Sequence, residues 1–147
     1  VHRARLPDRD EIPQFRGGVG GDAVRLGALF DESGKRCVLG RVWKTGNAWE
    51  RARGLLGRPR LAEGEGLLLE PCSSVHCIGM SYALDLVYVD RRGRVCKLVH
   101  GLKPWRFSAS LRGHATLEMA AGALQATGIR LGDVLVWRED AECAMNR

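Results

Sequence analysis

GEGLLLEPCSSVHCIGMSYALDLVYVD, residues Gly64–Asp90, is the stretch that decides the fold of this chain. It contains two apolar runs, 66–70 and 84–90, whose length and content of Leu and Val are typical of strands. The first run is unbroken, which predicts burial on both faces, and Pro71 ends it. Between the runs lies a polar segment, residues 72–83, which we call the elbow. The reactive or polarisable side chains of the elbow are Cys72, His76, Cys77 and Met80.

Short elements extend outward from this stretch. Further strands are predicted at 37–44, 95–100, 114–119 and 134–137. A helix is predicted from Asn47 to Leu56, because Asn47 and Glu50 have the spacing of a capping box, and a second one at 122–127 ends at Gly128. This pattern predicts an α+β fold: a compact mixed or antiparallel, partly barrel-like sheet with one or two short helices.

The length and composition are those of a single domain with one core. The chain has 147 residues, of which 45% are hydrophobic and 27% charged. Residues 1–33 mix charged residues with glycine and predict a flexible N-terminal arm with a short ordered patch at 23–30. We expect a globular domain at 34–140 and a polar tail at 141–147.

The cysteines and the apolar runs bear on the compartment. The five cysteines are odd in number and irregularly spaced, which predicts reduced thiols in a cytoplasmic protein rather than a disulfide framework. No apolar run approaches the roughly 20 residues that span a bilayer, so we expect a small soluble domain without a membrane span. The visible N-terminus lacks the apolar core of a secretory signal; because the first residue is Val, loss of an upstream signal is the open alternative.

Several segments in order resemble a known family. They are WERARGLLGRPRL, the Gly64–Asp90 stretch continued by RRGRV, the Pro104-Trp105 step, ATLEMAAGA and IRLGDVL. Together they cover about Trp43 to Trp137 and resemble domain of unknown function 192, a bacterial and archaeal family. The resemblance implies one compact domain of mixed α and β structure and no agreed enzymatic activity.

The same resemblance selects the candidate site. Met80, Asp85, Glu118 and Arg53 match the family's motif residues by type, and His76 matches its S-x-V-H branch. Ser81 stands where the family usually has a basic residue after the methionine. We therefore expect a binding or accessory module that holds a small anionic ligand or a protein partner at these five residues.

The two acids of this set allow other roles. A carboxylate turned toward apolar neighbours must be paired or protonated, so Asp85 is expected to form a structural ion pair, with Arg53 as a candidate partner. The alternative is a hydrolase-like enzyme in which Asp85 and Glu118 converge as general acid and base.

The elbow cysteines suggest two further alternatives. Cys72, His76 and Cys77 could ligate zinc with His100 or His114 as fourth ligand, but their spacing is not that of a zinc site, and we expect neither a metal nor a cofactor. Cys77 could act as a thiol nucleophile with a histidine base, whereas a buried structural cysteine is the commoner outcome. Met80 is expected to pack.

A formal charge of +6 and a pI near 9.4 allow an anionic partner. The basic residues between 91 and 112, where no acid occurs, are Arg91, Arg92, Arg94, Lys97, Lys103, Arg106 and Arg112. With Trp105, the pair Lys103 and Arg106 could bind single-stranded nucleic acid or another anion. This is the alternative to a solvated loop; no nucleic-acid-binding motif is present, so nucleic acid is not the expected partner.

Overall fold

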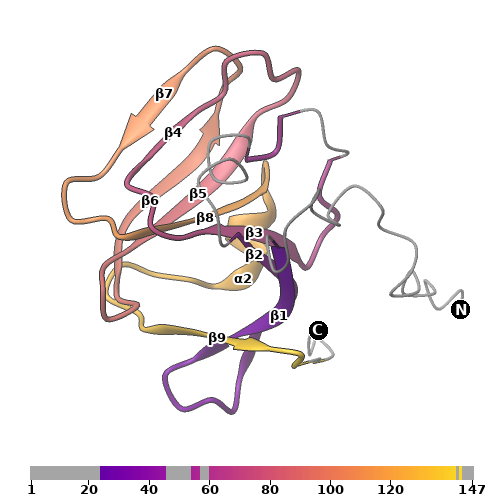
Figure 1. Ribbon diagram of the computed structural model, residues 1–147, viewed down its shortest axis with the longest axis vertical. Coiled ribbons are helices and arrows are strands. Elements are labelled where there is room, and N and C mark those ends of the chain that lie inside the picture. The colour runs from indigo at the N-terminus through magenta and orange to yellow at the C-terminus, as the bar shows by residue number, and fades with distance from the viewer. Residues whose placement is uncertain (1–23, 46–53, 57–59, 142, 144–147) are drawn as a thin grey trace, which may run out of the picture.

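A computed structural model describes residues 24–45, 54–56, 60–141 and 143. A seven-stranded sheet forms its centre, in the order β6-β5-β8-β3-β2-β1-β9, and a two-stranded sheet of β4 and β7 lies beside it (Figure 1). The strands are β1 (Val24–Asp31), β2 (Cys37–Thr45), β3 (Glu65–Leu69), β4 (Ser74–His76), β5 (Leu84–Val89), β6 (Val95–Leu102), β7 (Phe107–Ala109), β8 (Ala115–Ala120) and β9 (Leu135–Glu139). Within the described residues α2 (Ala123–Thr127) is the one helix.

The large sheet is mixed and open. β2 pairs with β3 in parallel, whereas the other strand pairs of the described chain are antiparallel. The edge strands β6 and β9 do not pair along their length; an isolated bridge between Arg94 and Val134, just before each strand, is their link. The predicted barrel is therefore not closed, and the part of the fold that the structure describes is mostly β with one short helix.

Alternating side chains form a core on each face of the sheet. On β5, Leu86 and Tyr88 belong to one buried cluster, and Val87 and Val89 belong to the other. β3 contributes to both clusters, which confirms its predicted burial on two faces. Because the central strands are covered on both sides, their apolar runs are nearly continuous.

One predicted boundary needs correction, and one predicted helix lies mostly outside the described residues. β1 lies inside the predicted flexible arm, and it pairs with β2 on one side and β9 on the other. Its alternating apolar residues thus form a strand of the sheet rather than an isolated patch. The predicted helix from Asn47 lies outside the described residues except for Gly54–Leu56, which form a turn with Gly54 at φ 51°.

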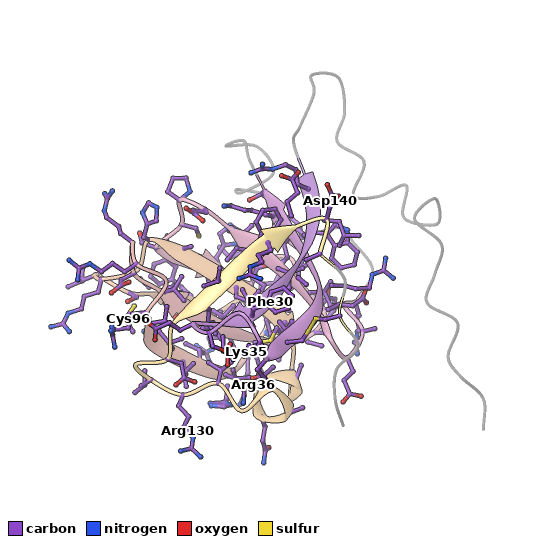
Figure 2. All side chains as sticks on the ribbon, turned by 90° about the horizontal axis from the view of Figure 1, so that it is seen from below. Phe30, Lys35, Arg36, Cys96, Arg130 and Asp140 are labelled. Carbon is purple, nitrogen blue, oxygen red and sulfur yellow. A yellow bond between two sulfur atoms is a disulfide. The ribbon has the colours of Figure 1, made fainter. Side chains whose placement is uncertain are left out.

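The prediction of five reduced cysteines is wrong for one pair. Cys37, the first residue of β2, forms a disulfide with Cys143, and the two Cα atoms are 6.1 Å apart (Figure 2). The bond ties the predicted polar tail to the sheet, a pairing that a separation of 106 residues hides in the sequence. Such bonds persist in oxidising compartments, which does not fit the predicted reduced cytoplasmic state.

The remaining cysteines are free: Cys72, Cys77 and Cys96. No helix in the described part of the chain is long and apolar enough to cross a membrane.

Candidate functional site

A cavity of about 270 Å³ lies between the Gly54–Leu56 turn and the elbow. Its polar wall residues come from two separate segments, and the rest of the wall is apolar. The lining residues are Gly54, Leu55, Leu56, Leu69, Ser74, Val75, His76, Ile78, Met80, Leu84 and Glu118. The volume is close to the lower end of the range for small-molecule sites, roughly 300–1,000 Å³.

Backbone pairing of the elbow shapes one side of the cavity. β4 pairs with β7, and the ladder continues beyond the strands: the Cys77 N–H donates to the Arg106 carbonyl at 2.9 Å, and the Trp105 N–H donates to the Cys77 carbonyl at 2.8 Å. The chain then turns back, with the Met80 N–H donating to the same Cys77 carbonyl at 3.2 Å. Gly79 adopts φ 81° within this turn, a conformation that glycine takes without steric cost. The turn delivers Met80, 8% exposed, to the cavity wall.

Glu118 reaches the cavity from β8 at the centre of the sheet. It is paired with Leu86 of β5, so its side chain shares a face with the buried cluster of Leu86 and Tyr88. The residue is 3% exposed. A Cβ atom added at Gly54 would stand 3.2 Å from the Glu118 Oε1 atom, so glycine allows this turn to approach the carboxylate closely. The cavity wall therefore combines this carboxylate and the side chains of Ser74 and His76 with aliphatic side chains.

The negative charge of Glu118 affects neighbouring groups. Burial, with this charge as the second cause, raises the pKa of the Cys77 thiol from 9.0 to about 11. The same two causes raise the pKa of Tyr82. These groups are therefore neutral at pH 7, and Cys77 is not an activated thiolate.

His76 lies at the rim of the cavity. It is exposed, and its Nδ1 atom accepts a 3.4 Å hydrogen bond from the Ile78 N–H. With Nδ1 as the acceptor, a neutral imidazole carries its hydrogen on Nε2. His76 can thus present an N–H donor to a group at the rim.

Asp85 does not belong to this site. Its carboxylate is 1% exposed and accepts three backbone hydrogen bonds, from Gly101 at 2.8 Å, Gly122 at 2.9 Å and Leu124 at 3.0 Å. It is paired with Met119 and so faces the side of the sheet opposite to Glu118. The hydrolase hypothesis, which needs both acids in one cleft, is therefore wrong, and the acid instead anchors the start of α2 and a bend in β6.

Cys72, His76 and Cys77, the elbow residues considered as zinc ligands, do not point toward a common metal position. Cys77 is fully buried and its thiol points to the Leu102 carbonyl at 3.8 Å, whereas the Cys72 thiol donates to the Ser74 carbonyl at 3.1 Å. In the part of the chain that the structure describes, no three His, Cys, Asp or Glu side chains are grouped to hold a metal ion.

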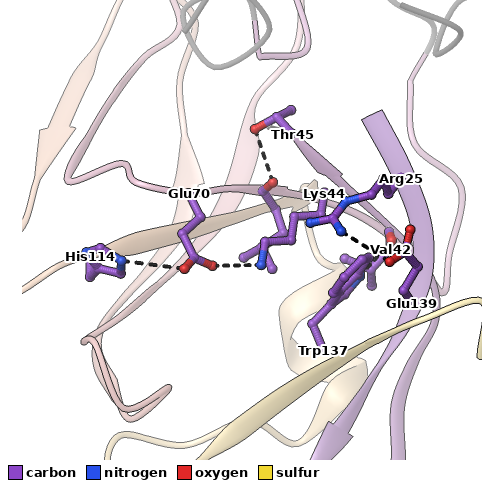
Figure 3. A network of polar contacts seen from close by, with 9 residues as sticks. Arg25, Val42, Lys44, Thr45, Glu70, His114, Trp137 and Glu139 are labelled. Atoms are coloured by element: carbon purple, nitrogen blue, oxygen red, sulfur yellow. Dashed lines mark hydrogen bonds and ion pairs between the residues drawn. The ribbon is translucent and has the colours of Figure 1, made fainter. Parts of the chain in front are cut away.

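The two histidines considered as a fourth zinc ligand do not join the elbow residues: His114 contacts Glu70, and His100 lies in β6. The His114 Nε2 atom lies 3.5 Å from Glu70 Oε1, and the other oxygen of Glu70 contacts the Lys44 Nζ atom at 3.2 Å (Figure 3). Lys44 in turn lies 5.1 Å from the centre of the Trp137 ring. His114 therefore belongs to a surface network over β2, and exposed His100 lies in β6.

Arg53, the fifth predicted site residue, lies outside the described residues, as does any ion pair that it forms with Asp85. The alternative anion-binding residues Lys103, Trp105 and Arg106 are exposed in the segment that connects β6 to β7. Trp105 and Arg106 border the elbow through the backbone hydrogen bonds to Cys77.

Residues 31–137 match the family DUF192, described as Uncharacterized ACR. The chain belongs to this family. Two solved structures resemble this DUF192 member, both with a TM-score of 0.65. One is a protein of unknown function from Novosphingobium aromaticivorans, which is 23% identical to this chain. The match covers 82% of this chain and 90% of the Novosphingobium chain. The other is a putative transcription regulator from Sinorhizobium meliloti, which is 21% identical. That match covers 78% of this chain and 94% of the Sinorhizobium chain.

Identities this low show a shared fold alone. No curated protein matches the chain. The resemblance identified from sequence motifs is thus confirmed, and no specific activity comes with it.

The sequence motifs of the DUF192 match did not reveal most of the cavity wall. Gly54, Ser74 and Ile78 line the cavity but are absent from the predicted site. Gly54 carried a usable signal, since glycine within a predicted helix often has a packing reason. Ser74 and Ile78 are set by the β4–β7 pairing, which no pattern in the elbow predicts.

Proposed function

We propose that this DUF192 chain is a binding module that holds a small ligand in the cavity between the Gly54–Leu56 turn and the elbow. The observation that carries the proposal is the convergence of His76, Met80 and Glu118, from separate parts of the sequence, on one cavity of about 270 Å³. A concave, largely apolar site with a few polar groups is the usual form of a small-molecule site.

The lining indicates the chemistry of the ligand. The side chains of Leu55, Leu69 and Leu84 suit an alkyl or ring group, since each methylene buried from water contributes about 0.8 kcal/mol. The charge of Glu118, which acts on the thiol of Cys77, disfavours a second negative charge nearby. The proposed ligand is therefore a small apolar molecule with a neutral or cationic head group, in place of the anion predicted from the sequence.

A head-group series tests this proposal. Hexylamine, hexanol and hexanoate carry the same alkyl chain, and their binding is measured by isothermal titration calorimetry. We expect hexylamine and hexanol to bind with a Kd on the order of 1 mM, and hexanoate at least several-fold more weakly. Glu118→Gln reduces the preference for hexylamine over hexanoate. Equal affinities for the three probes would contradict the assigned chemistry.

A blocking variant tests the location. Ser74 is exposed at the cavity wall, so Ser74→Phe fills the opening without entering the core. Ser73→Phe is the matched control, because Ser73 is also exposed but does not line the cavity. We expect Ser74→Phe to abolish hexanol binding and Ser73→Phe to retain it. Loss in both variants, or in neither, would place the binding elsewhere.

A further inference from the structure

Large apolar side chains are exposed at the start of β7 and in segments close to it in sequence or backbone pairing. Ile78 is 52% exposed, Trp105 69%, Phe107 68% and Leu111 106%. We call these four residues the β7 face. Other described strands keep their large apolar residues largely inward, so this grouping is unusual for a surface.

Backbone pairing brings three members of the face together. Phe107 is paired with His76 across β4 and β7, and Trp105 donates its N–H to the Cys77 carbonyl next to Ile78. Ser108, between the exposed Phe107 and Ala109, is 8% exposed, so alternate residues of β7 point outward. Leu111 follows two residues after the end of the strand. β7 is the outermost strand at the upper left of Figure 1, where the large sheet does not cover it.

Trp105 is held in an uncommon conformation. Its φ is 65°, the left-handed region that a bulky side chain rarely adopts. Backbone outliers of this kind cluster at functional positions, because the surrounding structure must stabilise them. Here the result is a tryptophan that is 69% exposed, with its backbone hydrogen-bonded to the residue before Ile78.

The charges around the β7 face are positive. Lys103, Arg106 and Arg112 are exposed within or beside it, and the Lys97 ammonium reaches β7 to donate to the Ala109 carbonyl at 2.7 Å. Between residues 71 and 112 the acids are Asp85, which is buried, and Asp90, which lies in the turn between β5 and β6. The β7 face thus combines exposed aromatic and aliphatic side chains with cationic ones. The segment between residues 71 and 112 has no solvent-accessible carboxylate apart from Asp90, which lies in the turn between β5 and β6.

We propose that the β7 face docks onto an anionic phospholipid bilayer. Tryptophan prefers the headgroup level of a membrane, and Lys and Arg beside it are attracted to anionic lipid. Single-stranded nucleic acid would use the aromatic rings and the cations, but it gives no role to exposed Ile78 and Leu111, because aliphatic side chains do not stack on bases. A bilayer accepts all four side chains.

Docking would also orient the cavity. Ile78 belongs both to the β7 face and to the cavity wall. The cavity opening therefore lies next to the proposed membrane contact. Docking does not require that the cavity binds a ligand, so the two proposals can fail separately.

Vesicle sedimentation tests the docking proposal. The whole chain is mixed with vesicles of phosphatidylcholine and phosphatidylglycerol, or of phosphatidylcholine alone, and the bound fraction is measured in the pellet. We expect binding to the anionic vesicles at low salt, with affinity at least tenfold higher than for phosphatidylcholine, and weakening as salt is raised.

Variants locate the contact. Trp105→Asn, which tolerates the left-handed backbone, combined with Phe107→Ser should reduce vesicle affinity at least tenfold. Leu131→Ser is the matched control, because Leu131 is 64% exposed in the turn before β9 and lies outside the β7 face. It should bind as the unchanged chain does.

Two charge-reversal variants test the contribution of the cationic side chains to vesicle binding. Lys103→Glu with Arg106→Glu should lower anionic-vesicle affinity at least tenfold, whereas Lys35→Glu with Arg130→Glu should have less than a threefold effect. Lys35 and Arg130 are exposed on loops, and Figure 2 labels both of them.

Four results would overturn the proposal. They are equal binding to both vesicle types, loss of binding in Leu131→Ser as large as in the Trp105 and Phe107 variant, tighter binding of oligo(dT) than of anionic vesicles, and dimerisation through the β7 face detected by light scattering.

Discussion

Asp85 shows at the scale of one residue how backbone N–H groups hold a buried carboxylate. Its two oxygens satisfy three backbone N–H groups that belong to β6 and to the start of α2. Since leaving one buried donor unsatisfied costs about 1–3 kcal/mol, we expect Asp85→Asn to lower the free energy of unfolding by about 3 kcal/mol. Urea denaturation measures the change.

Asp133→Asn is the control for this prediction. Asp133 accepts one exposed backbone bond, from Arg130 at 2.8 Å, and its replacement should cost about 1 kcal/mol or less. Equal losses in the two variants would show that the Asp85 contacts contribute no more than those of a surface turn.

We expect the ionisation of Cys77 to lower the free energy of unfolding at alkaline pH. Its pKa rises from 9.0 to about 11 in the folded chain, because burial and the charge of Glu118 disfavour the thiolate. Between these values the unfolded chain loses the proton and the folded chain keeps it, so the stabilising contribution present below pH 9.0 is lost as the pH rises toward 11. The slope is at most about 1.4 kcal/mol per pH unit.

Urea denaturation at several alkaline pH values measures this slope. Cys77→Ala should flatten it, whereas Val75→Ala, another shortened side chain in the same buried cluster, should keep it. An unchanged slope in Cys77→Ala would mean that the thiol ionises equally in both states.

Sequence reasoning at this scale predicted that Asp85 is paired or protonated and expected an ion pair, whereas the partners within the described residues are backbone N–H groups. It could not find the partners, because Gly101 and Gly122 are distant in sequence and contribute backbone groups that any residue except proline provides. It also could not separate Asp85 from Glu118, because the face on which each acid lies depends on the register between β5 and β8.

At the scale of elements, the disulfide fastens the C-terminal segment to β2. Closing a loop of this length restricts the unfolded chain, and we expect Cys37→Ser with Cys143→Ser to lower stability by about 2–4 kcal/mol. Urea denaturation with and without reductant checks this: reductant should destabilise the unchanged chain and leave the double variant as it was. Alkylation of both cysteines in the unreduced, denatured chain would contradict the pairing.

Most strands of five or more residues were predictable, whereas β1, which lies in the predicted flexible arm, and the three-residue strands β4 and β7 were not. The alternating runs that became β2, β5, β6 and β8 carry their own period, and the helix that became α2 ends at Gly128 as predicted. β4 and β7 have three residues each and occur in segments interpreted as a polar elbow and a basic loop. Their pairing depends on each other rather than on local sequence, so no pattern signals it.

At the scale of the whole molecule, the cavity needs parts that the sequence keeps far apart. His76 and Met80 come from the elbow, Glu118 from β8, and Gly54 from a segment predicted to be helical. The family motifs named three of these residues, but the space between them follows from packing. Motifs can thus select candidate residues without indicating which of them meet.

The central claim, that this cavity binds a small apolar ligand, is tested most directly by methyl NMR of the chain labelled at methionine. The chain has three methionines: Met80 lines the cavity, Met119 is buried on the opposite face of the sheet, and Met145 lies outside the described residues. Titration with hexanol should shift the Met80 methyl signal saturably and leave that of Met119 in place. A Met80 signal that does not move, or that moves together with Met119, would contradict the account.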